Sequence, residues 1–97
     1  MDFVFEIIDK TGRKIHLSKE RWNHITIKHP YISDRLEDIK NALINPNFII
    51  QHKFDRTMKN YYFYYKLEKY YLLVSVKYLN GEGFIATAFL TRKFIRR

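Results

Sequence analysis

Two long apolar runs near the C-terminus are separated by three residues, which begin with the dipeptide Asn80-Gly81. The runs, YYLLVSVKYL and GFIATAFLT, are rich in the β-branched and aromatic residues that favour strands. Asn-Gly adopts the positive φ angles of a tight hairpin turn at little cost. The sequence therefore predicts an antiparallel hairpin over residues 70–91.

More strand patterns precede this hairpin. FIIQHKF (48–54) and KNYYFYYKL (59–67) come before it, and a turn at residues 68–69 joins the second run to the hairpin. Three strands joined by tight turns must pair as an antiparallel meander. Residues 3–17 predict a shorter hairpin, in which FVFEIID alternates with the period of a strand, KTGRK is the turn and KIHL is the returning strand. This hairpin either extends the sheet or covers one of its edges.

Between these two regions the pattern is helical. Ser18 can cap a helix over residues 19–28, and the His-Pro dipeptide that follows forces a boundary. A cap at Ser33 or Asp34 opens a second helix, which runs to about residue 43. We therefore expect an α+β fold, with an N-terminal β-hairpin and two helices packed on an antiparallel sheet of about four strands.

The length of 97 residues fits one domain, residues 1–97. The absence of cysteine excludes disulfides, thiolate zinc sites and a thiol nucleophile. The N-terminal stretch MDFVFEIID is acidic, and its apolar run is too short for a signal peptide. No segment reaches the ~20 apolar residues that span a bilayer. We expect a cytoplasmic protein with no membrane partner.

The chain is strongly basic, with 18 Lys and Arg, 10 Asp and Glu, and a formal net charge of +8. Such a charge attracts polyanions, so nucleic acid is the first candidate partner. An acidic protein, an anionic membrane surface or simple solubility would also account for it. The many tyrosines and phenylalanines favour unpaired bases over duplex grooves.

The helix over residues 19–28 carries a cluster of candidate functional side chains. Trp22 and Ile25 share one face and are expected to anchor the core. Arg21, His24 and Lys28 share an adjacent face at spacings of three and four, where a cleft beside the sheet can meet them. His24 is therefore the first candidate for a general acid or base.

His29 either faces inward or marks the mouth of the cleft, and both it and His24 can instead be structural histidines. The two are five residues apart, an awkward spacing for metal ligands on one helix face, and acidic residues do not cluster. Phosphodiester cleavage would then proceed without metal or another cofactor. This restricts the substrate to RNA, whose 2′-hydroxyl is an internal nucleophile.

Strict alternation divides the last two strands between two faces. One face carries small and apolar residues and is expected to meet the helices: Phe84, Ala86, Ala88 and Leu90. The other face carries hydroxyls, cations and rings: Tyr71, Leu73, Ser75, Lys77, Ile85, Thr87, Phe89 and Thr91, with Lys93 if the strand continues. Such a face can bind phosphates and bases, or it is an ordinary solvated sheet face.

Four motifs in order resemble one known family. RWNHITIKHPYI, NPNFI, YYLLVSVKY and FIATAFLTRK are similar to the phage-barnase-EndA-colicin-RelE-like nuclease domains (BECR superfamily), over about residues 17–93. The resemblance implies N-terminal helices on an antiparallel sheet of about four strands. It also implies a metal-independent ribonuclease, since many members are RNA-cleaving toxins of phage, conjugative or toxin–antitoxin systems.

The resemblance also suggests which residues do the chemistry. Its catalytic candidates are His24, His29, Lys77, Thr87 and Thr91. Its further cations are Lys93, at the end of the last motif, and more loosely Arg56, in the loop FDRTMKN. Together with Arg21 and Lys28 from the helix face, these two complete the predicted RNA-binding set.

The sequence thus predicts a small basic endoribonuclease that needs no metal, a toxin that cuts tRNA or mRNA and is held inactive by an acidic antitoxin protein. A non-catalytic RNA-binding module that uses the same basic and aromatic face is the first alternative. An interaction domain whose charge only meets an acidic partner is the second.

Overall fold

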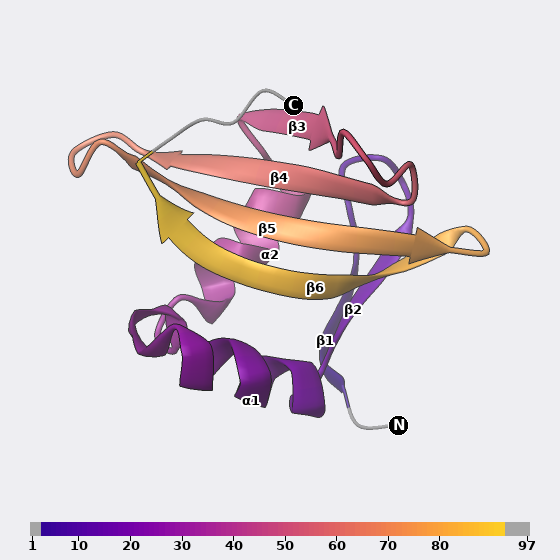
Figure 1. Cartoon of the computed structure of the whole chain (residues 1–97), viewed down its shortest axis with the longest axis horizontal. Coiled ribbons are helices and arrows are strands. Elements are labelled where there is room, and N and C mark those ends of the chain that lie inside the picture. The colour runs from indigo at the N-terminus through magenta and orange to yellow at the C-terminus, as the bar shows by residue number, and fades with distance from the viewer. Residues whose placement is uncertain (1–2, 93–97) are drawn as a thin grey trace.

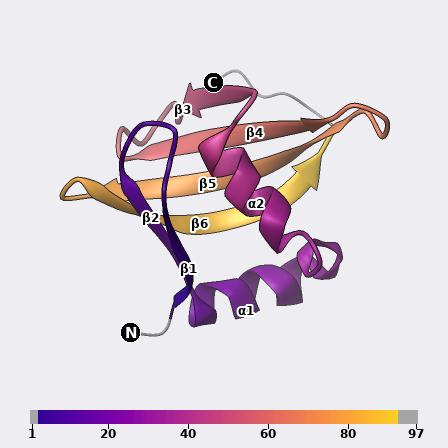
Figure 2. The same cartoon turned by 180° about the vertical axis from the view of Figure 1, so that it is seen from behind.

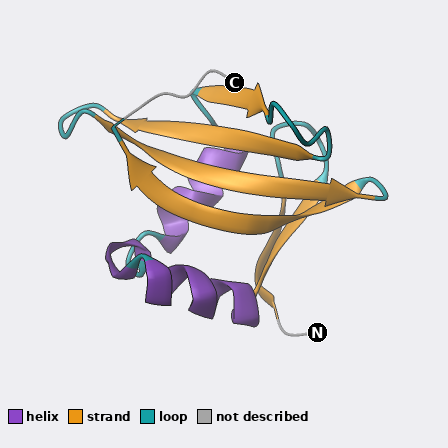
Figure 3. Cartoon of the chain, viewed as in Figure 1, coloured by secondary structure: helices purple, strands orange, loops and turns teal. Residues whose placement is uncertain are grey.

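The computed structural model of the protein describes residues 3–92 as a six-stranded sheet with two α-helices (Figures 1 and 3). The elements are β1 (Phe3–Ile8), β2 (Lys14–Ser18), α1 (Lys19–Lys28), α2 (Leu36–Ile44), β3 (Phe48–Gln51), β4 (Met58–Tyr65), β5 (Tyr70–Leu79) and β6 (Glu82–Thr91). The strand order is β1-β2-β6-β5-β4-β3. The α+β class predicted from the sequence is confirmed.

The prediction of an antiparallel sheet of about four strands is wrong, because the N-terminal hairpin joins the sheet. β2 pairs with β6 in parallel through Ile15–Gly83 and His16–Phe84. Gly83 leaves room for this pairing, since a Cβ atom there would lie 2.7 Å from the end of the Ile15 side chain and 3.1 Å from the Lys77 carbonyl oxygen. The result is one mixed sheet in which β1 forms one edge and β3 the other.

The C-terminal meander follows the sequence prediction closely. Asn80 and Gly81 have φ angles of 54° and 84°, as the tight turn requires, and β5 covers the predicted range. β3 ends at Gln51, earlier than expected. Residues 52–57 form a loop instead, in which the Phe54 amide donates to His52 Nδ1 at 3.2 Å.

The two helices occupy different positions on the sheet. α2 packs across β4 and β5 on one face, and α1 runs beside β6 (Figures 1 and 2). The core lies between the sheet and the helices, and its fully buried side chains include Ile15, Leu17, Ile32, Ile39, Leu43, Tyr61, Leu72, Val74 and Val76. The opposite face, which we call the open face, has no helix of the described chain across it (Figure 1).

The helix boundaries are only partly as predicted. α1 begins as expected, with Ser18 Oγ accepting from the Arg21 amide at 3.1 Å. The prediction that Ser33 or Asp34 caps the second helix is wrong. A 3₁₀ turn covers Pro30–Ile32, and α2 starts only after Arg35, whose amide bonds the Ile32 carbonyl at 3.0 Å.

A β-bulge in β6 changes which side chains face the helices. Ser75 pairs with Thr87 but Val76 pairs with Ile85, so Ala86 is an extra residue without a partner of its own on β5. Ile85 and Ala88 therefore both face the core, whereas Phe84 and Thr87 face the other side. The predictions that Ile85 shares a face with Thr87 and that Phe84 meets the helices are wrong.

A buried carboxylate connects the hairpin to the rest of the sheet. Asp9, 5% exposed, follows β1 and accepts from the hydroxyls of Tyr61 on β4 and Tyr78 on β5, the latter at 2.8 Å. Its other oxygen accepts from the Thr11 and Arg13 amides at 2.9 and 3.0 Å. Burial acts to raise the pKa of Asp9, but these hydrogen bonds outweigh it and hold the pKa below its ordinary value of 3.8.

Asp9→Ala is expected to destabilise the fold by about 2–4 kcal/mol, because two buried tyrosine hydroxyls and the turn amides lose their acceptor. Urea unfolding of Asp9→Ala, with the exposed Asp34→Ala as the matched control, measures this. The pKa of Asp9 is lowered in the fold, so its stabilisation is present above pH 3.8 and declines as the pH falls below that value. Equal unfolding of both variants at pH 7 would contradict the prediction.

Candidate functional site

A cavity of about 370 Å³ lies between α1 and β6. Its lining consists of two cations, a histidine, a threonine and apolar groups: Arg21, His24, Ile25, Ile27, Lys28, Ala86 and Thr87. These residues come from two elements that are far apart in the sequence but adjacent in the fold (Figure 1). We call this space the α1–β6 cleft.

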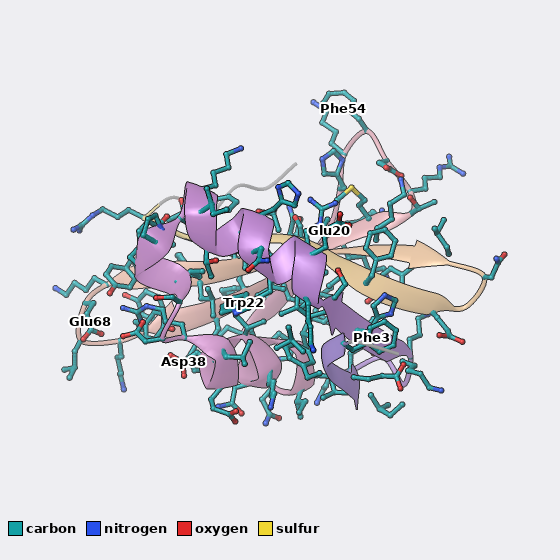
Figure 4. The ribbon with its side chains drawn as sticks, turned by 90° about the horizontal axis from the view of Figure 1, so that it is seen from below. Phe3, Glu20, Trp22, Asp38, Phe54 and Glu68 are labelled. Carbon is teal, nitrogen blue, oxygen red and sulfur yellow. The ribbon has the colours of Figure 1, made fainter. Side chains whose placement is uncertain are left out.

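The sequence sets the orientation of α1 at the cleft. Ile25 is 3% exposed and anchors the helix in the core, while Trp22 packs against the core from a half-buried position (Figure 4). The expectation that both are core anchors is therefore met fully by Ile25 and in part by Trp22. With Ile25 buried, helical spacing directs Arg21, His24 and Lys28 together toward β6.

The bulge in β6 supplies the opposite wall of the cleft. Because Ala86 is the extra residue, Thr87 faces the open side beside its partner Ser75. The Ser75 hydroxyl donates to Asn60 Oδ1 on β4, so a row of polar groups extends from the cleft across the middle of the open face. A hydroxyl at Thr87 can donate to a phosphate oxygen that enters the cleft.

His29 lies close to the cleft but is not part of its lining. Its ring stacks on Phe89 with centroids 5.5 Å apart, and its Nδ1 lies 3.1 Å from the Tyr31 hydroxyl. The predicted proton carriers therefore differ in their surroundings. His24 is exposed on the cleft, whereas His29 is held by two aromatic neighbours.

Lys77 lies on the open face near the end of β5, opposite Met58 and Phe84, and has an acidic partner that the sequence did not suggest. Its Nζ is 3.2 Å from Asp55 Oδ2, in the loop between β3 and β4. Asp55 also accepts from the hydroxyl and the amide of Thr57 at 2.5 and 2.9 Å. The Thr57 hydrogen bonds, and then Lys77, lower the pKa of Asp55 to about 2. An anionic ligand must compete with this carboxylate for Lys77.

The remaining predicted residues are not in the cleft. Thr91 lies at the end of β6 opposite Tyr71, roughly 13 Å along the strand from Thr87 at 3.3 Å per residue. Arg56 is exposed in the loop next to Asp55. Lys93 is outside the described residues, 3–92.

The open face is more apolar than its sequence pattern indicates. Tyr62 is fully buried and Leu73 is 3% exposed, although neither faces the helices. The Tyr71 ring meets Tyr62 and Tyr64, with centroids 5.7 and 4.9 Å apart, and Phe48 at 6.4 Å. This small aromatic layer lies away from the cleft, beyond Ser75, and it gives the open face rigid rings as well as hydroxyls.

Comparison of the chain with protein-family models, with curated proteins and with solved structures finds no match. The resemblance to the BECR nucleases therefore stays a prediction. Within residues 3–92, no three His, Asp or Glu side chains gather as a metal site would need. No helix in that range is long and apolar enough to cross a bilayer.

The surroundings of Asp55 can be tested by titration. Thr57→Val removes the hydrogen bond that contributes most to the low pKa of Asp55, and Lys77→Met removes the ion pair. Both changes should raise that pKa toward its ordinary value of 3.8, Thr57→Val the more. Carboxyl-carbon NMR titrations of the two variants measure the pKa of Asp55 in each. A larger rise of this pKa in Lys77→Met than in Thr57→Val would show that the ion pair dominates.

Proposed function

We propose that this protein is a small metal-independent endoribonuclease and that the α1–β6 cleft is its active site. The observation that carries the proposal is the presence of His24 in one cavity with Arg21, Lys28 and Thr87. A proton carrier, two cations and a hydroxyl are the groups that RNA cleavage by its own 2′-hydroxyl requires. The net charge of +8 supports RNA as the substrate.

The residues of the cleft suggest a sequence of steps. Neutral His24 takes the proton from the 2′-hydroxyl as O2′ bonds to phosphorus, and Arg21 stabilises the added charge on the phosphorane. The bond from phosphorus to O5′ then breaks, and the ammonium of Lys28 supplies the proton to O5′. The products are a 2′,3′-cyclic phosphate and a 5′-hydroxyl, and water returns His24 and Lys28 to their starting protonation states.

The other predicted residues would act on the RNA around the scissile bond. Thr87 donates to a phosphate oxygen, and Lys77 binds a neighbouring phosphate when that phosphate replaces Asp55. Thr91, at the far end of β6, and Arg56, in the β3–β4 loop, would contact the strand farther from the cleft. His29 would support the end of α1 through Phe89 and Tyr31.

The resemblance extends this proposal to a toxin that cuts tRNA or mRNA. A free nuclease of this kind would harm its own cell, so an inhibitor that covers the cleft is expected. An acidic antitoxin protein fits the basic surface of the chain. The rival function is an RNA-binding module without catalysis, favoured by the aromatic layer of the open face.

One experiment separates these functions. The purified protein is incubated with total tRNA in EDTA, and the ends of any fragments are mapped. Discrete fragments with 2′,3′-cyclic phosphates support the ribonuclease. Binding without cleavage supports the RNA-binding module. The absence of both leaves an interaction domain for an acidic partner and overturns the proposal.

His24→Ala should reduce cleavage by about 10²–10⁴-fold, because a positioned acid or base contributes that much. Its RNA affinity should stay within a few-fold, because a neutral imidazole adds little attraction for phosphate. His29→Ala is the matched control and should cut RNA far faster than His24→Ala, since His29 does not line the cleft. Both variants must keep the wild-type melting temperature. A larger loss in His29→Ala would make His29 the proton carrier.

The salt dependence of RNA affinity measures how many cations of the cleft contact phosphates. The logarithm of RNA affinity should fall by roughly 0.7 per log unit of salt for each phosphate that the protein neutralises. Arg21→Gln and Lys28→Gln should each reduce this slope by about that amount. Lys66→Gln, in the turn between β4 and β5, is the control and should leave the slope unchanged. A wild-type slope near zero would exclude nucleic acid as a partner.

A further inference from the structure

A second cavity, of about 290 Å³, lies at the other end of β6 from Thr91, near the turn between β5 and β6. Its lining comes from β2, the end of β5, the turn and the start of β6: His16, Leu79, Asn80, Glu82, Gly83 and Phe84. None of these residues was singled out as functional by the sequence. We call this space the β2–β6 pocket.

Flat rings form one wall of the β2–β6 pocket. The parallel pairing of β2 with β6 places His16 directly beside Phe84, with ring centroids 6.0 Å apart. Phe3 stacks on the far side of His16, with centroids 4.2 Å apart and planes within 20°. This row of three rings is fixed by backbone pairing. Phe3 already covers one face of His16, so the Phe84 ring is the lining group on which an unpaired base can stack.

The rim of the pocket is polar and includes a negative charge. Asn80 is exposed in the turn and presents an amide, and Glu82 is exposed at the start of β6 and presents a carboxylate. A carboxylate repels phosphate, so the RNA backbone is not expected in this pocket. It accepts hydrogen bonds from the amino and imino groups on the edges of bases.

The pocket and the α1–β6 cleft lie along the same strand. Phe84, in the pocket, and Thr87, in the cleft, both face the open side of β6. They are three residue steps apart on the strand, so their Cα atoms are separated by roughly 10 Å, somewhat less because of the bulge at Ala86. A short stretch of single-stranded RNA with a phosphate in the cleft can therefore place a nearby base in the pocket.

We infer that the β2–β6 pocket binds one unpaired nucleobase of the RNA strand that enters the cleft, and that Glu82 selects a base with an exocyclic amino group. The inference rests on the proposed RNA-cleaving function and adds a specificity site to it. Phe84 supplies stacking, and Glu82 accepts from the amino group. Uracil is the disfavoured base at this position, because it has no amino group and its single imino group lies between two carbonyl oxygens that repel a carboxylate.

The test uses a pool of single-stranded RNA with random sequence, cut by the wild type and by Glu82→Gln, and sequenced at the new ends. The wild type should disfavour uracil at one fixed position beside the cut. Glu82→Gln should reduce this preference by about 3–10-fold, through the loss of a hydrogen bond to a charged acceptor. The matched control is Glu68→Gln, at the opposite end of the sheet from Phe3, and it should keep the wild-type preference (Figure 4).

A binding measurement makes the result independent of cleavage. Short oligonucleotides with 2′-deoxyribose throughout cannot be cut by this route, and they differ only in one base. Wild-type protein should bind the cytosine and adenine forms more tightly than the uracil form, and Phe84→Leu should weaken all of them by about 5–10-fold through the loss of stacking. Phe84→Leu is compared only if its melting temperature matches the wild type.

The outcomes separate the inference from the function on which it rests. Cleavage or binding with the same base preference in wild type, Glu82→Gln and Glu68→Gln overturns the pocket and leaves the ribonuclease intact. Binding without cleavage, but with a preference that Glu82→Gln loses, supports the pocket in an RNA-binding protein. A wild type that neither binds nor cuts RNA overturns both.

Discussion

The carboxylate of Asp9 is the interaction on which the relation of the N-terminal hairpin to the sheet depends. One of its oxygens fixes the turn through the Thr11 and Arg13 amides, and the other binds the buried hydroxyls of Tyr61 and Tyr78. A hairpin alone is only marginally stable in water. This buried network holds it against β4 and β5 and so supports the short parallel contact between β2 and β6. Through that contact the Asp9 network also positions the wall of the β2–β6 pocket.

The placement of α1 follows from the same hairpin. β2 ends at Ser18, which caps α1, so the direction in which β2 leaves the sheet sets where the helix starts. Ile25 then fixes the rotation of the helix, and the cations on its neighbouring face meet β6. Burial of Ile25 and capping of α1 by Ser18 are therefore enough to bring the cations of the helix to the cleft, without hydrogen bonds between those cations and the sheet.

Three different surfaces border or lie on the open face: the cationic cleft, the β2–β6 pocket and the aromatic layer. The cationic cleft and the β2–β6 pocket lie along β6, and the aromatic layer around Tyr71 lies toward β3. Lys77 lies beside Phe84 of the pocket, and its charge is paired with that of Asp55. A single-stranded RNA is a ligand that can use all three, because it has both a charged backbone and flat bases. A purely acidic protein partner would make less use of the rings.

Much of the local structure was predictable from the sequence. Asn80-Gly81, the range of α1 and its Ser18 cap were predicted correctly, because each depends on residues that are adjacent in the chain. The shared face of Arg21, His24 and Lys28 follows in the same way from helical spacing. In contrast, the start of α2 was missed, because a 3₁₀ turn over Pro30–Ile32 precedes it and its N-cap, Arg35, makes no side-chain cap hydrogen bond.

The arrangement of the site was decided by tertiary structure. The bulge at Ala86 has no marker such as glycine in the sequence, and only pairing with β5 shows that it shifts the alternation at Ile85. The Asp55–Lys77 ion pair and the His16–Phe84 pairing join residues from separate parts of the chain. Hydrophobic periodicity and turn residues predict the conformation of a segment only from residues close to it in the sequence. Register between strands depends on how all the buried side chains pack at once, so the sequence determined the elements and the packed sheet determined the cleft and the pocket.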